Sequence, residues 1–336
     1  MSNERAILFN CAGESLSAEE RGFFRDADPV GFILFQRNCR DPEQVRALAA
    51  ALRDCVGRDD APVLVDQEGG RVARLKPPEW RRYPAAAQLA ALPDADAAVR
   101  LGARLIADDL AALGITVDCA PVLDLPVAGA DAVIGDRAYG GAPALVARLG
   151  RAMCEGLLAG GVLPVVKHIP GHGRARVDSH RALPVVDADA QELAKTDFEP
   201  FRALGDMPWA MTAHVVFSTI DTRQPATLSP VVIDKVIRGA IGFDGVLVSD
   251  DINMGALAGT IGERVRNTLA AGCDLALHCS GRLGEMREAA EAAAPVTSES
   301  AQRLARGETL RRRSFEVFDR REAEARFDAM TRALVG

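Results

Sequence analysis

Residues 163–173 read LPVVKHIPGHG, an apolar run of strand type that passes directly into polar residues, a proline and two glycines. The run predicts a buried strand, and the proline and glycines predict a loop after it. Stretches of helical period lie on both sides, at 143–159 and 188–203. A strand that is apolar throughout and flanked by helices is typical of a parallel sheet with both faces covered.

The same alternation recurs along the chain. Strands are predicted at residues 6–10, 31–36, 61–65, 115–120, 163–167, 209–215, 245–249 and 273–277. Helices are predicted at 17–26, 42–56, 94–113, 143–159, 188–203, 229–239 and 263–271. Eight such units over about 280 residues favour a closed barrel over an open doubly wound sheet. We expect an α/β fold, a single (β/α)8 TIM-type barrel over about residues 1–295 with extra C-terminal helices over 296–336, all in one catalytic domain.

The composition is typical of a soluble globular protein, with 48% apolar and 26% charged residues among 336. The 47 acidic residues outnumber the 40 basic ones, which argues against a general affinity for nucleic acid or an anionic membrane. No apolar run approaches the roughly 20 residues that span a bilayer. The seven cysteines have scattered spacing without a CxxC pair, and no export signal is visible, so a cytoplasmic protein with reduced thiols is expected.

In a barrel of this kind the catalytic groups follow the carboxyl ends of the strands. Polar residues stand at or after six of the predicted strands: Asp66, Arg71 and Arg74; Asp118, Asp124 and Arg137; Lys167, His168 and His172; His214; Asp250 and Asp251; and His278. With His180, all five histidines of the chain follow such an end. This clustering indicates one polar active site on one face of the barrel.

The loop after residue 173 contains Asp178-Ser179-His180. In an extended segment residues i and i+2 point to the same side, so the Asp178 carboxylate can bond one imidazole nitrogen of His180. Such a bond fixes the tautomer and leaves the other nitrogen free for proton transfer. The alternative is an incidental Asp-x-His in a surface loop. His168 and His172 have a zinc-type spacing, but that spacing suits a helix and this segment is a loop, so no metal and no cofactor is expected.

Asp250 ends an apolar strand, where a carboxylate can attack an electrophilic carbon or stabilise positive charge. The alternative is a helix N-cap or a loop salt bridge, and Asp66 has the same ambiguity. Three aromatic residues, Trp80, Tyr83 and Trp209, are candidates for stacking against the ring of a ligand, although each is more often core.

Four blocks of the sequence resemble glycoside hydrolase family 3, in particular its single-domain bacterial β-N-acetylglucosaminidases. The blocks are VDQEGGRVAR at 65–74, KHIPGHG at 167–173, DSH at 178–180 and LVSDDINM at 247–254. They occur in the family's order, and the likeness runs from about residue 5 to residue 290. Ile169 stands where the family commonly has Phe, and the loop around Arg137 is a looser version of the family's Arg-containing loop.

The resemblance implies a retaining exo-β-N-acetylglucosaminidase that works through a covalent glycosyl-enzyme. Asp250, not Asp251, would be the nucleophile, and His180 the acid/base with Asp178 as its orienting partner. The residues that would hold the sugar are Asp66, Arg74, Arg137, Lys167 and His168. The resemblance also implies the substrate: muropeptides of cell-wall recycling, with N-acetylglucosamine on anhydro-N-acetylmuramic acid, with or without peptide.

Three other functions remain open at this point. Phosphate could open the glycosyl-enzyme in place of water, because a histidine tolerates an incoming anion better than a carboxylate does. A metal-dependent barrel hydrolase would use His168, His172 and His214. A non-catalytic sugar-binding relative is disfavoured by the presence of Asp178, His180 and Asp250.

Overall fold

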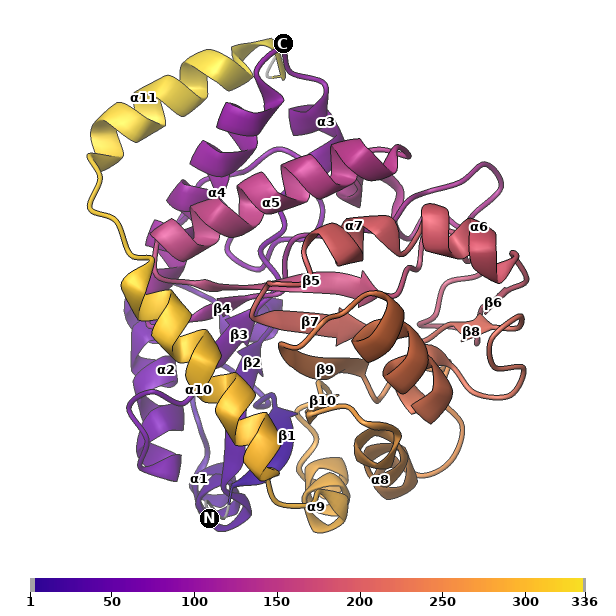
Figure 1. The fold of residues 1–336 in the computed structure, drawn as a ribbon. Helices are drawn as coiled ribbons and strands as arrows, with labels where there is room; N and C mark the ends of the chain where they lie inside the picture. Colours follow the sequence, from indigo (N-terminus) through magenta and orange to yellow (C-terminus); the bar gives the residue numbers. More distant parts are fainter. Residues whose placement is uncertain (1–3, 335–336) are drawn as a thin grey trace.

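The computed structural model describes residues 4–334, and eight parallel strands in it close into one barrel in the order β1-β10-β9-β7-β5-β4-β3-β2 (Figure 1). The barrel strands are β1 (Arg5–Phe9), β2 (Pro29–Leu34), β3 (Val63–Val65), β4 (Val117–Asp118), β5 (Leu163–Ile169), β7 (Trp209–Thr212), β9 (Val246–Asp251) and β10 (Leu275–His278). The predicted (β/α)8 barrel is therefore confirmed. Asp66 directly follows β3, and Asp250 lies near the end of β9. Because the strands are parallel, both residues lie at the same rim of the barrel.

Helices surround the barrel (Figure 1). They are α1 (Ala18–Ala27), α2 (Pro42–Val56), α3 (Ala86–Ala90), α4 (Ala95–Ala111), α5 (Pro143–Ala159), α6 (Ala190–Lys195), α7 (Glu199–Ala203), α8 (Ile261–Ala271) and α9 (Leu283–Ala292). Shorter 3-10 turns are η1 (Gln36–Asn38), η2 (Gly135–Arg137) and η3 (Ala226–Leu228), and η4 (Val232–Ala240) is π-helical. Among the described residues, no helix combines the length and apolar character needed to cross a bilayer.

Local sequence explains where the first helix begins. The Ser17 hydroxyl accepts a hydrogen bond from the Glu20 amide, and the Glu20 carboxylate accepts one from the Ser17 amide. This capping box satisfies two of the free amides at the start of α1. The next long helix starts with Asp41 as its N-cap and Pro42 in its first turn, and ends at Gly57 with φ of 63°, which is a glycine conformation.

The structure differs from the predicted elements in one helix and in an additional pair of strands. The helix expected over 188–203 is divided into α6 and α7, because the chain leaves helical geometry at Thr196 and Pro200 lacks an amide proton. A short parallel pair, β6 (Val185–Val186) with β8 (Val216–Phe217), lies outside the barrel and was not predicted. Strands of two residues carry too little periodicity to be recognised in a sequence.

Two apolar layers form the core. One fills the barrel, and the other lies between the strands and the surrounding helices. Trp209 is 1% exposed and belongs to the first layer. Tyr83 is buried beside Phe327, and Trp80 packs against the outer layer. Burial leaves Tyr83 and Trp209 no ring face for a ligand, so for these two the core alternative is correct. Trp80 is only partly buried, and its role stays a prediction.

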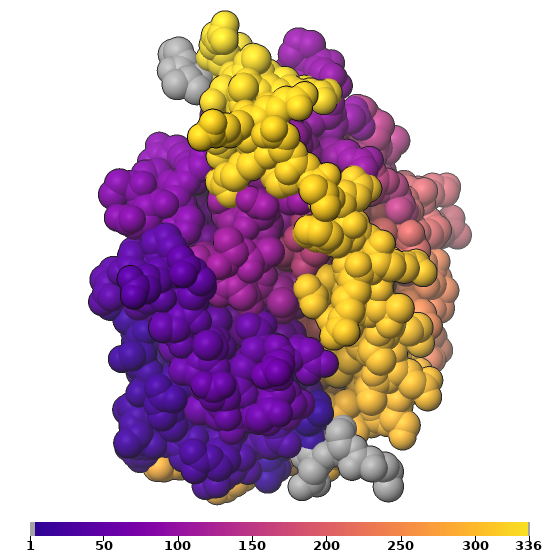
Figure 2. All heavy atoms as spheres, turned by 90° about the vertical axis from the view of Figure 1, so that its left-hand side faces the viewer, coloured from indigo at the N-terminus to yellow at the C-terminus, as the bar shows by residue number. Residues whose placement is uncertain are grey.

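The C-terminal segment is helical, as predicted. It forms α10 (Ser298–Arg313), α11 (Arg320–Thr331) and the turn η5 (Arg332–Leu334), while residues 1–3 and 335–336 of the predicted domain lie outside the described residues. In Figure 1, α10 lies at the end of the barrel where β5 and β7 begin, opposite the ends that carry the polar residues. Figure 2 shows the whole segment, in yellow, lying against one side of the molecule.

Candidate active site

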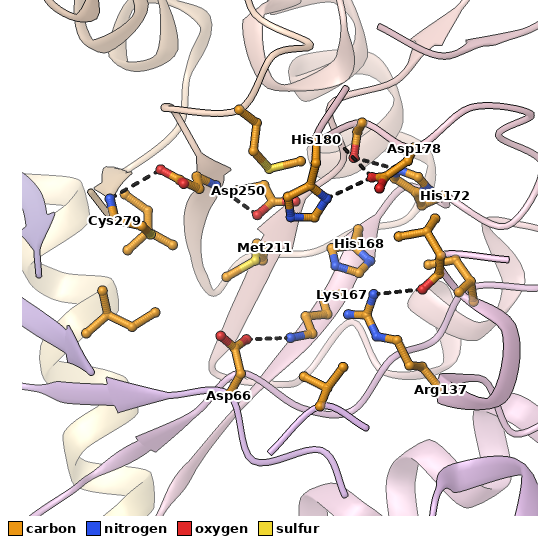
Figure 3. Close-up of a pocket in the computed structure, with 18 of the residues that line it drawn as sticks. Asp66, Arg137, Lys167, His168, His172, Asp178, His180, Met211, Asp250 and Cys279 are labelled. Atoms are coloured by element: carbon orange, nitrogen blue, oxygen red, sulfur yellow. Dashed lines mark hydrogen bonds and ion pairs between the residues drawn. The ribbon is translucent and has the colours of Figure 1, made fainter. Parts of the chain in front are cut away.

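A cavity of about 440 Å³ lies at the carboxyl ends of the barrel strands (Figure 3). All eight predicted site residues line it: Asp66, Arg74, Arg137, Lys167, His168, Asp178, His180 and Asp250. They come from strand ends and loops that lie up to 184 positions apart in the sequence (residues 66 to 250). Apolar side chains complete the wall, among them Ile134, Met211 and Met254.

Asp250 lies near the end of β9 and accepts a hydrogen bond of 2.8 Å from the Asp251 amide. Burial raises the pKa of its carboxyl, but the imidazoles of His214 and His168 and the Asp251 amide oppose this, and the net pKa is lowered. Asp250 is therefore a carboxylate at neutral pH. Its side chain lines the cavity, and only one oxygen is held by the backbone amide.

The adjacent Asp251 has a different environment. Its Oδ1 accepts hydrogen bonds from the amides of Asn253 at 3.0 Å and Cys279 at 3.2 Å. Burial raises the pKa of this carboxyl to about 6. Asp251 thus joins the loop after β9 to the end of β10.

The Asp178–His180 pair forms as expected, but not for the expected reason. His180 Nδ1 lies 2.8 Å from Asp178 Oδ1, which leaves Nε2 free. The segment is a turn rather than an extended strand: Asp178 Oδ1 also accepts from the His180 amide, and the Asp178 carbonyl accepts from the amides of Arg181 and Ala182. The side chain of His180 is 65% exposed, and in Figure 3 its ring points into the cavity between Asp178 and Asp250.

Fixed charges form the opposite wall. Lys167 Nζ lies 2.8 Å from Asp66 Oδ1 and 2.7 Å from Glu68 Oε1. Arg74 binds the other Asp66 oxygen at 2.9 Å, and Arg137 makes two bonds of 2.8 Å to Glu68. Burial raises the pKa of Asp66, but Lys167 and Arg74 lower it by more than burial raises it. The net pKa is therefore lowered, and this carboxyl stays ionised. The sequence prediction missed Glu68, although it lies between Asp66 and the two glycines in the matched block.

A second carboxylate that the site prediction left out is Asp124. It is fully buried, and its Oδ2 lies 2.6 Å from His168 Nδ1. Its Oδ1 accepts from the backbone amides of His168 at 3.3 Å and His172 at 2.6 Å. Its position after the fourth strand was the only signal, and that signal does not distinguish it from other aspartates in loops.

The clustering of histidines on one face holds for three of the five. His168, His172 and His180 line the cavity. His214 does not line it: its Nε2 donates to the Asp251 carbonyl at 3.0 Å, and its Nδ1 lies 2.7 Å from the Thr227 hydroxyl. His278 is fully buried against the ring of Phe9.

These contacts bear on a metal site at His168, His172 and His214. One ring nitrogen of His168 and one of His172 are bound to Asp124 and Ser179, and both nitrogens of His214 are used. Within residues 4–334, no group of three or more His, Cys, Asp or Glu side chains is arranged to hold a metal ion.

The chain is similar to proteins of a known family. The family model described as the N-terminal domain of glycosyl hydrolase family 3 matches residues 11–306. A beta-hexosaminidase of Pseudomonas aeruginosa is 39% identical over 280 residues, which are 82% of this chain and 83% of that protein.

Two solved structures have the same fold. One is the NagZ protein of Neisseria gonorrhoeae in complex with N-trifluoroacetyl-D-glucosamine, with a TM-score of 0.86 and 33% identity over 98% of both chains. The other is a glycoside hydrolase family 3 β-N-acetylglucosaminidase from Paenibacillus, with a TM-score of 0.85 and 34% identity. That match covers 94% of this chain but only 62% of the Paenibacillus chain.

Proposed function

This chain belongs to glycosyl hydrolase family 3, and we propose from that premise that it is a retaining exo-β-N-acetylglucosaminidase. One observation carries the proposal: Asp250, the Asp178–His180 pair and the Asp66–Lys167 cluster line the same cavity. A nucleophile, a proton donor and polar groups for a sugar are the parts that a retaining glycosidase needs.

In the first step the Asp250 carboxylate attacks the anomeric carbon from below and the glycosidic bond breaks. His180, protonated at Nε2, donates that proton to the departing oxygen. The product is a sugar ester of Asp250 and a free alcohol. In the second step His180 removes a proton from water, water attacks the same carbon, and the ester bond to Asp250 breaks. Asp178 holds the imidazole through Nδ1 and so leaves Nε2 directed at the departing oxygen.

The sugar is held by the opposite wall. Asp66 accepts hydrogen bonds from sugar hydroxyls, while Arg74, Arg137 and Lys167 donate to sugar oxygens. His168 offers Nε2 to the sugar, since its Nδ1 is bound to Asp124. Ion pairs with Asp66 and Glu68 fix the two buried cations Lys167 and Arg137 before substrate arrives. Preorganised donors of this kind bind a neutral sugar without a cost of reorganisation on binding.

The substrate proposed is a muropeptide fragment, N-acetylglucosamine on anhydro-N-acetylmuramic acid with or without peptide, because the family resemblance implies it. We place the enzyme in the cytoplasm, where the seven free and buried cysteines of the chain would stay reduced. Release of N-acetylglucosamine from purified muropeptides, followed by chromatography, tests the substrate. Cleavage of aryl glycosides but not of muropeptides would contradict this part of the proposal.

Trapping the intermediate tests the mechanism. A slow 5-fluoro glycosyl fluoride that keeps the 2-acetamido group should add one sugar mass to the protein, and peptide mapping should locate it on Asp250. A label on Asp251 or on another residue would contradict the assignment of the nucleophile. The absence of any label, together with inversion of the product anomer by NMR, would contradict the retaining mechanism.

A further inference from the structure

Ser179, between Asp178 and His180, is buried, in contrast to the exposed His180. Ser179 is only 3% exposed, whereas the His180 side chain is 65% exposed. The Ser179 hydroxyl lies 3.0 Å from His172 Nε2, and the Ser179 carbonyl accepts from the Ala256 amide at 3.1 Å. Ser179 therefore joins this turn to two other loops of the barrel rim.

The first of these loops follows β5 and holds His172 firmly. The His172 amide donates to Asp124 at 2.6 Å, and the same carboxylate binds His168. Close packing continues at Gly173, where a Cβ atom would lie 2.0 Å from the Leu125 carbonyl oxygen, so only glycine fits. Burial lowers the pKa of His172 to about 4, so its ring is neutral at neutral pH. The Ser179 hydroxyl is therefore hydrogen-bonded to a histidine that its own loop holds in place.

The second loop follows β9, the strand of Asp250. Besides the bond from the Ala256 amide, Gly255 packs directly on the backbone of the turn: a Cβ atom there would lie 2.9 Å from the His180 carbonyl oxygen and 3.2 Å from that of Arg181. The turn is therefore held between the loop that follows Lys167 and the loop that follows Asp250.

His180 has little else to fix its position. Asp178 is the only hydrogen-bond partner of its ring within residues 4–334, and that partner belongs to the same turn. The place of the imidazole relative to Asp250 therefore depends on the backbone of the turn. A misplacement of roughly 1 Å can slow catalysis about 100-fold.

We propose that Ser179 and His172 are positioning residues for the acid/base, which hold the Asp178–His180 turn at the height where His180 Nε2 reaches the departing oxygen above Asp250. This inference rests on the proposed function of His180. It adds two residues that act on the reaction through the position of His180.

The test compares substrates that differ in their need for an acid. Ser179→Ala should lower kcat/KM roughly 10- to 100-fold on an N-acetyl-β-glucosaminide with a poorly leaving alcohol, since general acid catalysis contributes about 10²- to 10⁴-fold. On a dinitrophenyl glycoside, which needs little protonation, the loss should be under about threefold. Ser229→Ala is the matched control, because it removes the hydroxyl of another buried serine outside the cavity.

A second pair of variants keeps the test independent of Ser179→Ala folding. His172→Gln places an amide nitrogen near the position of Nε2 and should retain part of the acid-dependent rate. His172→Leu removes the partner of Ser179 and should show the same substrate dependence as Ser179→Ala. In the double variant Ser179→Ala/His180→Ala, the serine change should cause no further loss on either substrate, since the group it positions is gone.

The outcomes separate this inference from the function on which it rests. If His180→Ala shows no preference for good leaving groups, the proposed acid role fails. If His180→Ala shows that preference but Ser179→Ala and His172→Leu slow both substrates equally, the positioning role is overturned. Equal rates for His172→Gln and His172→Leu on the poor substrate would also contradict it.

Discussion

Two neighbouring carboxylates at the end of β9 have opposite surroundings. Asp250 lines the cavity with one oxygen held by a backbone amide, and its pKa is lowered. Asp251 gives one oxygen to the amides of Asn253 and Cys279, and burial raises its pKa to about 6. Both residues line the cavity, but a nucleophile must be ionised, and Asp250 meets this condition better than its neighbour does.

Asp250→Ala is therefore expected to lower turnover of an aryl N-acetyl-β-glucosaminide by about 10⁴-fold or more, because no other group can form the sugar ester. Initial rates measured with a chromogenic substrate check this. Asp251→Asn keeps an oxygen acceptor for the two backbone amides and should lose much less activity. Reversed magnitudes for the two variants would show that the neighbours have exchanged roles.

Individual residues also decide whether water or phosphate opens the glycosyl-enzyme. Arg74, Arg137 and Lys167 each form an ion pair with Asp66 or Glu68, so two carboxylates already offset most of the charge of the three cations. An incoming phosphate would have to displace a carboxylate from these cations. We expect ³¹P NMR to show no sugar 1-phosphate in phosphate buffer. The rate of sugar release should also be the same as in a non-phosphate buffer of equal ionic strength. A phosphate-dependent rise in rate would contradict this.

Among the elements, β4 is short, and it ends in a buried carboxyl that faces the charged wall. Asp118 is fully buried, its Oδ1 accepts from the Gln67 amide at 2.9 Å, and its Oδ2 has no partner within residues 4–334. Burial raises the pKa of Asp118 to about 7. The folded protein therefore holds this proton more tightly than the unfolded chain does, where the pKa is about 3.9.

The contribution of Asp118 to the free energy of unfolding should consequently fall by on the order of 2–4 kcal/mol as the pH rises from about 4 to about 7. Asp118→Asn cannot titrate and should have a flatter dependence. Urea unfolding at pH 5, 6, 7 and 8 measures both slopes. The unpaired amide of the variant lowers stability at every pH, so only the difference in slope is informative; parallel curves would refute the assignment.

At the scale of the whole molecule, the C-terminal helices complete the outer wall of the barrel. Phe327 of α11 is 1% exposed, and a Cβ at Gly102 of α4 would lie 2.8 Å from its ring. Arg320 at the start of the same helix pairs with Asp108 and Asp109. α11 thus buries apolar surface of a helix that would otherwise be exposed.

Phe327→Ala should lower the free energy of unfolding by about 3–5 kcal/mol, the usual cost of truncating a buried Phe. Its kcat at 25 °C should stay within about threefold of the parent, because α11 does not line the cavity. Val317→Ala in the preceding linker is the control, since Val317 is 91% exposed. A stable variant, or one that is folded but inactive, would contradict this account of α11.

The barrel itself, and which residues meet at its rim, was determined by the sequence alone. Apolar runs such as 163–167 and 246–249 are local signals of buried strands, and parallel closure then brings whatever follows each strand to one rim. Among the residues after the strands, the eight that the family resemblance selected all line one cavity. The caps at Ser17 and Asp41 and the loop at Pro170 were predictable in the same way, because they depend on neighbours within a few positions.

What only the tertiary structure decided is how those residues are paired. The bonds of Glu68 to Arg137 and of Asp124 to His168 join residues 69 and 44 positions apart, and no local pattern selects among the many carboxylates of the chain. The position of the turn at 178–180 is likewise set by its contacts with His172 and Ala256, although its own hydrogen bonds to Asp178 form the turn. Side-chain partners across a barrel are chosen by burial, since a charge removed from water must find whichever counter-charge the closed fold places beside it.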